Sequence, residues 1–219
     1  TYQFHHQVNI LGVNMPFDFI RFASDYLPVQ QSDQVGLSFS GEFEGHRVKA
    51  GAYHRWLAGQ LFYAYGTALL REFDRGFAAH QGRAYGLELE HQADFGRLSA
   101  NTGYTLAYSK VSVADATGFR KWVYPVQDVR HQVNVGLQYS FAKRWQLTGQ
   151  WFLQTGSPYT FPVGIIPAQG LTPVSNPRPI PAFEELNNVR TPIRHRLDLG
   201  LTHKRQLRKG SSEWNFGIY

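Results

Sequence analysis

Residues 131–156 read "HQVNVGLQYSFAKRWQLTGQWFLQTG" and hold two runs of alternating apolar and polar side chains, separated by Ala142-Lys143-Arg144. Successive side chains of a strand point to opposite faces of a sheet, so this alternation predicts a hairpin of two long strands. Each strand would have one apolar and one polar face. The apolar positions are Val133, Val135, Leu137, Tyr139 and Phe141 in the first run and Trp145, Leu147, Gly149, Trp151 and Leu153 in the second.

The same period of two recurs along the whole chain, and no segment shows a convincing helical period. The pattern predicts about nine strands of roughly 9–14 residues. They are expected near 2–10, 34–44, 46–65, 81–93, 97–110, 129–141, 145–155, 193–204 and 212–219.

The connections between these segments alternate strictly between long and short. The short ones are expected at 44–46, 94–97, 142–144 and 204–212, and the long ones at 11–33, 66–80, 110–128 and 156–190. An up-and-down antiparallel sheet with all its short turns at one end produces this order. Transmembrane barrels of the bacterial outer membrane are built so, whereas soluble sandwiches mix connection lengths and usually have shorter strands.

Composition narrows the function classes. The chain has 219 residues, a net charge of +6, no cysteine and no Lys/Arg block, so neither thiolate chemistry nor a nucleic-acid partner is expected. No apolar run reaches the ~18 residues of a membrane helix. The mean hydropathy of −0.36 is typical of soluble proteins. A membrane barrel gives similar values, because only every second strand residue faces lipid.

Amphipathic strands of this length would expose more apolar surface than a soluble monomer tolerates. The sequence contains no amphipathic helices to cover them, so we expect membrane lipid to do so. Tryptophan and tyrosine near strand ends would form the interfacial aromatic belts of such a barrel. These residues are Trp56, Tyr63, Tyr65, Tyr108, Trp145, Trp151, Trp214 and Tyr219.

The polar face carries complementary charges. Lys49 and Arg55 are one strand away from Glu88 and Glu90, and Arg196 shares its face with Asp198. We interpret these groups as salt bridges of the wall rather than as a solute path. Such a face suits a wide lumen that is hydrated or filled by another polar domain.

Several phrases resemble the C-terminal barrel half of TonB-dependent outer-membrane receptors. The closest likeness is to the Bacteroidetes type, which carries a carboxypeptidase-regulatory-like domain and a plug before the barrel. The phrases are "YGLELEHQADFGRLSANTGYTLAYSK" (85–110), "YPVQDVRHQVNVGLQYSFAKRWQLTGQWFLQTGSPYTFP" (124–162), "NNVRTPIRHRLDLGL" (187–201), "MPFDFIRFASDYLPVQQSDQ" (15–34) and "EWNFGIY" (213–219). Together they cover well over half of the chain.

The resemblance implies an all-β fold, a transmembrane antiparallel up-and-down β-barrel of 22 strands. Residues 1–219 would form one partial barrel domain with about nine of them. The plug, the TonB box, the first half of the barrel and the last strand would lie outside the chain.

The implied function is TonB-dependent uptake of a scarce solute across the outer membrane of a Gram-negative bacterium. Siderophore, cobalamin, glycan and peptide remain open as solute classes. The implied partners are membrane lipid, lipopolysaccharide, TonB, the plug domain and the solute. The protein would not be an enzyme, would need no cofactor or metal, and would bind the solute through residues that the sequence does not identify.

Three alternatives remain. The first is a passive, porin-like channel. The second is an outer-membrane hydrolase, for which Asp128, Arg130 and His131 resemble a carboxylate–imidazole pair that activates water. The third is a soluble all-β binding module. Ser157 lacks the Gly-x-Ser-x-Gly frame of a nucleophile elbow.

Other candidate groups have simpler explanations. Adjacent strand residues point to opposite faces, so His5 and His6 cannot easily share a metal ion. Arginines of the long connections could meet lipopolysaccharide phosphates or an anionic ligand, although solvation also explains them. These are Arg71, Arg75, Arg120, Arg178 and Arg190. The proline-rich segment 156–190 suits an ordered ligand lid, or equally a loop that only holds its shape.

Overall fold

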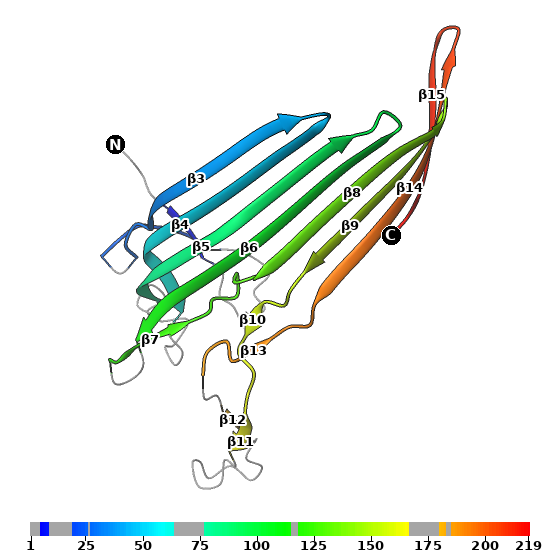
Figure 1. Ribbon diagram of the computed structural model, residues 1–219. Helices are drawn as coiled ribbons and strands as arrows, with labels where there is room; N and C mark the ends of the chain where they lie inside the picture. Colours follow the sequence, from blue (N-terminus) through cyan, green and yellow to red (C-terminus); the bar gives the residue numbers. More distant parts are fainter. Residues whose placement is uncertain are drawn as a thin grey trace, which may run out of the picture. The chain divides into compact units, whose positions relative to one another are not determined.

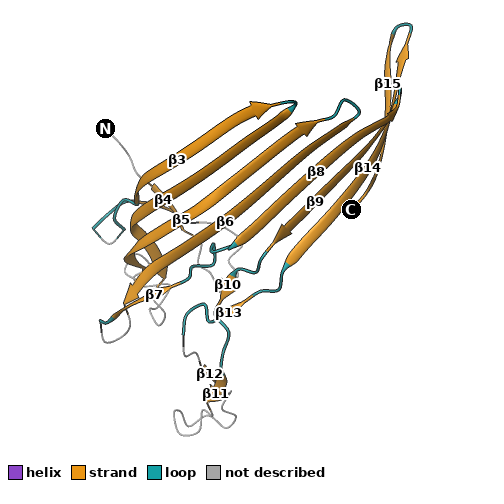
Figure 2. Cartoon of the chain, viewed as in Figure 1, coloured by secondary structure: helices purple, strands orange, loops and turns teal. Residues whose placement is uncertain are grey.

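The computed structural model describes residues 5–8, 19–25, 27–63, 77–114, 118–166, 180–182 and 185–219. In these ranges all regular structure is β-strand (Figure 2). None of the described residues forms a helix long and apolar enough to cross a membrane. The prediction of an all-β chain is confirmed.

The main sheet is antiparallel and follows the order of the chain (Figure 1). Along the sheet the long strands run β15-β14-β9-β8-β6-β5-β4-β3, and the short strand β7 pairs with β6 outside this path. The up-and-down order predicted from the sequence is therefore confirmed. The bounds are β3 Gln31–Phe43, β4 His46–Tyr63, β5 Phe77–Asp94, β6 Leu98–Ala114, β7 Arg120–Val123, β8 His131–Ala142, β9 Trp145–Gln154, β14 Arg194–Leu207 and β15 Gly210–Ile218.

The chain forms two compact units. The first comprises Thr1–Val35, His54–Ala84 and Ser109–Val123, and the second comprises Gly36–Tyr53, Tyr85–Tyr108 and Tyr124–Tyr219. All four short turns of the main sheet belong to the second unit, where they follow β3, β5, β8 and β14 at one end of the strands (Figure 1). We call this the turn end. The connections that join the opposite strand ends are long, as predicted.

The strand register of the second unit places the apolar positions of neighbouring strands side by side. Leu199 of β14 pairs with Gly149 of β9, which pairs with Leu137 of β8, which in turn pairs with Ala100 of β6. Leu137 is 48% exposed and Leu199 is 44% exposed. The described part of the chain thus provides no second layer over this apolar face.

The expected first strand differs from the structure. Residues 2–10 were predicted as a strand of the barrel wall, but their described part, β1 (His5–Val8), pairs with β2 (Phe19–Phe22) in a separate two-stranded sheet. That prediction is wrong for these residues. A short alternating run reveals a strand, but it does not identify the partner of that strand.

The segment 156–190 contains short strands that the sequence analysis left as loop. β10 (Pro158–Tyr159) pairs with β13 (Val189–Arg190), and β11 (Gly164–Ile166) pairs with β12 (Ile180–Ala182). None of these joins the main sheet. The expectation that 156–190 is a long connection between strands of the main sheet is therefore confirmed for its described residues.

Gly59 is a backbone constraint of the first unit. It lies inside β4 with a φ of 70°, in the left-handed region that side chains with a Cβ rarely adopt. A Cβ atom there would stand 2.7 Å from the carbonyl oxygen of Val29. The segment before β3 therefore approaches β4 closely only because residue 59 is glycine.

We expect Gly59→Ala to lower the free energy of unfolding by about 2 kcal/mol or more, because it adds a backbone clash to left-handed strain of ~1–2 kcal/mol. Gly96→Ala is the matched control, since Gly96 has a φ of 77° but open space around it. Urea unfolding followed by tryptophan fluorescence measures both. Equal midpoints for the two variants would contradict the close approach.

Candidate functional site

Charged side chains on the polar face of the second unit pair with one another. Lys49 Nζ lies 3.7 Å from Glu90 Oε1, and Arg196 Nε lies 2.6 Å from Asp198 Oδ1. The prediction of wall salt bridges is confirmed for these pairs. In the first unit, Arg55 instead donates two hydrogen bonds to Gln34 Oε1, at 2.9 and 2.6 Å. These groups are largely exposed, so each pair contributes little to stability.

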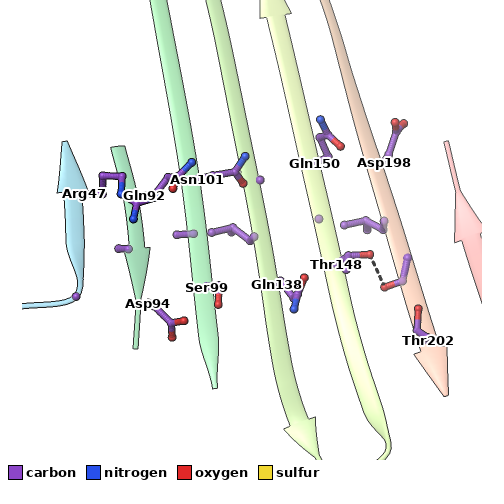
Figure 3. A pocket seen from close by; sticks show the side chains of 18 of the residues that line it. Arg47, Gln92, Asp94, Ser99, Asn101, Gln138, Thr148, Gln150, Asp198 and Thr202 are labelled. Atoms are coloured by element: carbon purple, nitrogen blue, oxygen red, sulfur yellow. Dashed lines mark hydrogen bonds between the residues drawn. The ribbon is translucent and has the colours of Figure 1, made fainter. Parts of the chain in front are cut away.

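A hollow of about 1080 Å³ lies over the polar face of the second unit. Figure 3 shows hydroxyl and amide side chains that project into it from neighbouring strands. Thr148 Oγ1 donates a hydrogen bond to the carbonyl oxygen of Gly200 at 3.3 Å. A surface of this kind can both donate and accept hydrogen bonds. The labelled polar groups are Arg47, Gln92, Asp94, Ser99, Asn101, Gln138, Thr148, Gln150, Asp198 and Thr202.

A buried carboxylate fixes the base of segment 156–190. The Asp128 side chain has no solvent exposure and pairs with Arg190 Nη2. Arg190 Nη1 donates to the carbonyl oxygens of Asp128 and Gly156, at 2.9 and 3.0 Å. Arg130 Nε lies 3.5 Å from Asp128 Oδ2. We call Asp128, Arg130 and Arg190 the arginine clasp.

Tyrosine rings enclose the arginine clasp. The Arg130 guanidinium carbon lies 4.6 Å from the ring centroids of both Tyr108 and Tyr124. Partial burial lowers the pKa of Arg130, but a hydrogen bond with Tyr124 and the negative charge of Asp128 outweigh it and leave the pKa above its usual value. The arginine therefore stays charged, and its cation–π contacts reinforce the ion pairs.

Asn187 adds further hydrogen bonds between segment 156–190 and residues 124–130. It has a φ of 55°, a left-handed conformation that asparagine tolerates better than most residues. Its Nδ2 donates to the carbonyl oxygen of Tyr124 at 2.7 Å, and its backbone N donates to Thr160 Oγ1 at 3.0 Å. The two ends of segment 156–190 are thus bonded to each other and to residues 124–130.

Asp128 and His131, considered above as a hydrolase pair, have separate structural partners. Asp128 pairs with the two arginines of the clasp, whereas His131 Nδ1 lies 2.8 Å from the Tyr104 hydroxyl. Ser157 N donates to Thr191 Oγ1 at 3.0 Å, as part of the pairing across the loop base.

The remaining candidates lie partly beyond the described residues. The side chains of His5 and His6, and all of Arg71, Arg75 and Arg178, lie outside them. Arg120 opens β7 and pairs in register with Ala114. Within the described ranges, no three His, Asp or Glu side chains gather in an arrangement that could hold a metal ion.

The sequence analysis missed a histidine pair on β4 and β5. His46 Nδ1 lies 3.0 Å from His91 Nε2, and the ring planes differ by 7°. The ring centroids are 5.3 Å apart. This distance is about the sum of the distance between the two nitrogens and one ring radius for each histidine. The rings therefore lie in line at hydrogen-bonding distance, beside Phe43 and Phe95. The two residues are 45 positions apart, so no local sequence signal links them.

Comparison with known proteins adds no assignment. No protein-family model matches the chain. No curated protein matches its sequence. The function must therefore be inferred from the fold and the geometry above.

We expect Asp128→Asn to lower the free energy of unfolding by about 3 kcal/mol, because it leaves two arginines without their buried counter-charge. Chymotrypsin should also cut faster after Tyr159, since the loop base loses its bonds. Asp198→Asn removes one carboxylate from an exposed pair and is the matched control, with an expected loss of about 0.5 kcal/mol. Unchanged proteolysis in Asp128→Asn would show that the clasp does not hold the loop.

Proposed function

We propose that this chain is part of the wall of a transmembrane β-barrel in a bacterial outer membrane, and that it belongs to a TonB-dependent solute receptor. The observation that carries the membrane proposal is the shared register of β6, β8, β9 and β14. It collects their apolar side chains on one face that the described residues leave uncovered. Lipid can cover such a face without leaving backbone groups unpaired, because the N–H and C=O groups of neighbouring strands bond to one another.

The width of the apolar band supports the same proposal. On β14, Leu197, Leu199 and Leu201 stand between His195 and His203 on one face. The eight residue steps from His195 to His203 span ~27 Å of strand, which is ~19 Å along the membrane normal for a strand tilted near 45°. This height already includes the row of His203 and is of the order of the ~25 Å apolar band of outer-membrane barrels.

Aromatic residues border this band at the turn end. His203 pairs in register with Trp145 and with Trp214, and the Trp145 and His203 rings lie 4.5 Å apart. Amphipathic rings of this type favour the boundary between headgroups and hydrocarbon. This row supports the predicted belt for Trp145 and Trp214.

The receptor proposal rests on the sequence phrases and on the arginine clasp. A receptor must hold its outer loops in a binding-competent arrangement, and the clasp fixes the base of the longest connection. In this scheme the chain supplies wall and loops, while TonB and a plug outside this chain drive release of the solute. Lipopolysaccharide would meet the long-connection side.

A passive channel is the second candidate, and the broad polar hollow favours it. Solute uptake by the full-length protein distinguishes the two. We expect uptake to stop when TonB is removed and single-channel conductance in planar bilayers to be negligible. Steady conductance with TonB-independent uptake would instead establish the channel.

The membrane proposal predicts opposite sensitivities on the two faces of the sheet. Leu199→Arg should reduce the free energy of folding into lipid vesicles by about 2–4 kcal/mol, because it places a charge near the bilayer midplane. Gln150→Arg, on the polar face beside Asp198, should cost far less. Urea titration of vesicle-bound protein measures both variants. Equal costs, or a wild-type chain that stays monodisperse without detergent, would refute the membrane wall.

A further inference from the structure

Four rings from two neighbouring hairpins meet at the turn end of the second unit. His46 opens β4, and its ring stacks on that of Phe43, the last residue of β3, with centroids 5.3 Å apart. His91 lies near the end of β5. Phe95 lies in the turn that follows, and its ring centroid is 5.4 Å from that of His46. His46 therefore contacts both the β3–β4 and the β5–β6 hairpin. We call the His46 and His91 rings the histidine link.

The geometry of the histidine link is that of a direct hydrogen bond. The facing nitrogens, His46 Nδ1 and His91 Nε2, are 3.0 Å apart, and the ring planes differ by 7°. A neutral imidazole has one N–H donor and one acceptor nitrogen, whereas both nitrogens of a charged imidazole are donors. One facing nitrogen must therefore carry the hydrogen and the other must accept it. The bonded pair can be neutral or carry one positive charge, but it cannot carry two.

A backbone hydrogen bond joins the two hairpins beside this link. The backbone N of Asp94 donates to the carbonyl oxygen of Gly45 at 3.0 Å. Gly45 directly precedes His46, and Asp94 follows His91 by three residues. The Asp94 amide therefore reports whether these ends of β4 and β5 remain together.

The charged side chains of these elements interact elsewhere. Among the described residues, no carboxylate lies within 4.0 Å of a nitrogen of His46 or His91. The charged strand residues near the link take the opposite parity to the histidines, and two pairs of them, Arg47 with Glu42 and Lys49 with Glu90, bond to each other. A second positive charge on the link would thus have no contacting anion to offset it. The charged residues nearest in sequence are Glu42, Glu44, Arg47, Lys49, Glu88, Glu90, Asp94 and Arg97.

We propose that the histidine link is a pH-sensitive connection between the β3–β4 and β5–β6 hairpins. It is closed while at most one ring is charged. It opens when both rings are protonated, because two N–H donors then face each other and two positive charges lie on rings with centroids 5.3 Å apart. Histidine ordinarily changes its charge between about pH 5 and pH 8, so acid opens the link toward the lower end of this range. The inference does not rest on the membrane or receptor proposal, since it concerns contacts within the sheet.

The test follows hydrogen exchange at the Asp94 amide by NMR, in the folded full chain at pH 7 and pH 5. A chelator is present, so that no metal ion can bridge the two rings. After correction for the intrinsic pH dependence of exchange, we expect the opening equilibrium of the wild type to be at least about fivefold larger at pH 5. This factor corresponds to the loss of one hydrogen bond of ordinary net strength.

His91→Gln separates the charge of the link from its hydrogen bond. A glutamine amide both donates and accepts and does not titrate, so it can bond to His46 at either pH. We expect this variant to lose most of the acid-induced opening. His46→Asn tests the same bond from the other strand and should give the same result. His203→Gln is the matched control, because His203 lies beside Trp145 at the turn end and contacts no second histidine among the described residues. It should respond to pH as the wild type does.

Three results would overturn the histidine link. One is a wild type whose Asp94 amide opens equally at both pH values. Another is an equal acid response in the wild type, His91→Gln and His46→Asn, because titration of the pair would then not control the opening. The third is a loss of the response in His203→Gln as well, which would show that acid acts on the turn end as a whole and not through this pair.

Discussion

The structure depends on one constraint: neighbouring strands must pair so that their period-two alternations stay in phase. The row Leu199, Gly149, Leu137 and Ala100 shows this phase across four strands. A slip of one residue in any pair would carry a whole set of leucines to the polar face. The two-residue turn Arg208-Lys209 leaves almost no slack between β14 and β15. Beside Lys143-Arg144 the register of β8 and β9 shifts by one residue between Tyr139 and Ala142, and from Tyr139 to Gln132 it runs without a further shift. The polar hollow and the apolar face are two consequences of the same register.

Charged side chains have three different roles in this structure, and the role depends on how deeply the side chain is buried. Exposed pairs of the wall, such as Lys49 with Glu90, keep the polar face near neutrality and add little stability. The fully buried Asp128 makes its arginines far more consequential, because water cannot replace them as partners. At the turn end, the exposed Arg97, Lys143 and Arg144 have no carboxylate partner among the described residues, so water solvates their charges. Sequence charge counts combine all three cases into a single net value of +6.

The sequence predicted the long strands well because amphipathic alternation is a local signal that a single-layer sheet must display. It failed at residues 2–10, where the same signal belongs to a small separate sheet formed with β2. It also gave no sign of the arginine clasp. Asp128 and Arg190 are 62 residues apart, and the proline-rich segment between them carries no periodicity that reveals its return path. The polar positions of the alternating strands indicated a hydrated face. The shape of the hollow on that face depends on which positions are glycine and which carry amide side chains. The Asn101 side chain, for example, occupies the space that a Cβ atom of residue 136 would need.

The sheet and the loop base therefore obey different physical rules. The wall is specified by repetition, so its side chains can vary as long as parity is kept. The loop base is specified by a few irreplaceable contacts: a buried carboxylate, two arginines and an asparagine in a left-handed conformation. Under the proposed receptor function, a loop fixed in this way would lose less conformational entropy on binding a solute, because part of its ordering is already complete in the free protein. In the proposed receptor, the rest of segment 156–190 could therefore change in sequence without disturbing either the clasp or the main sheet.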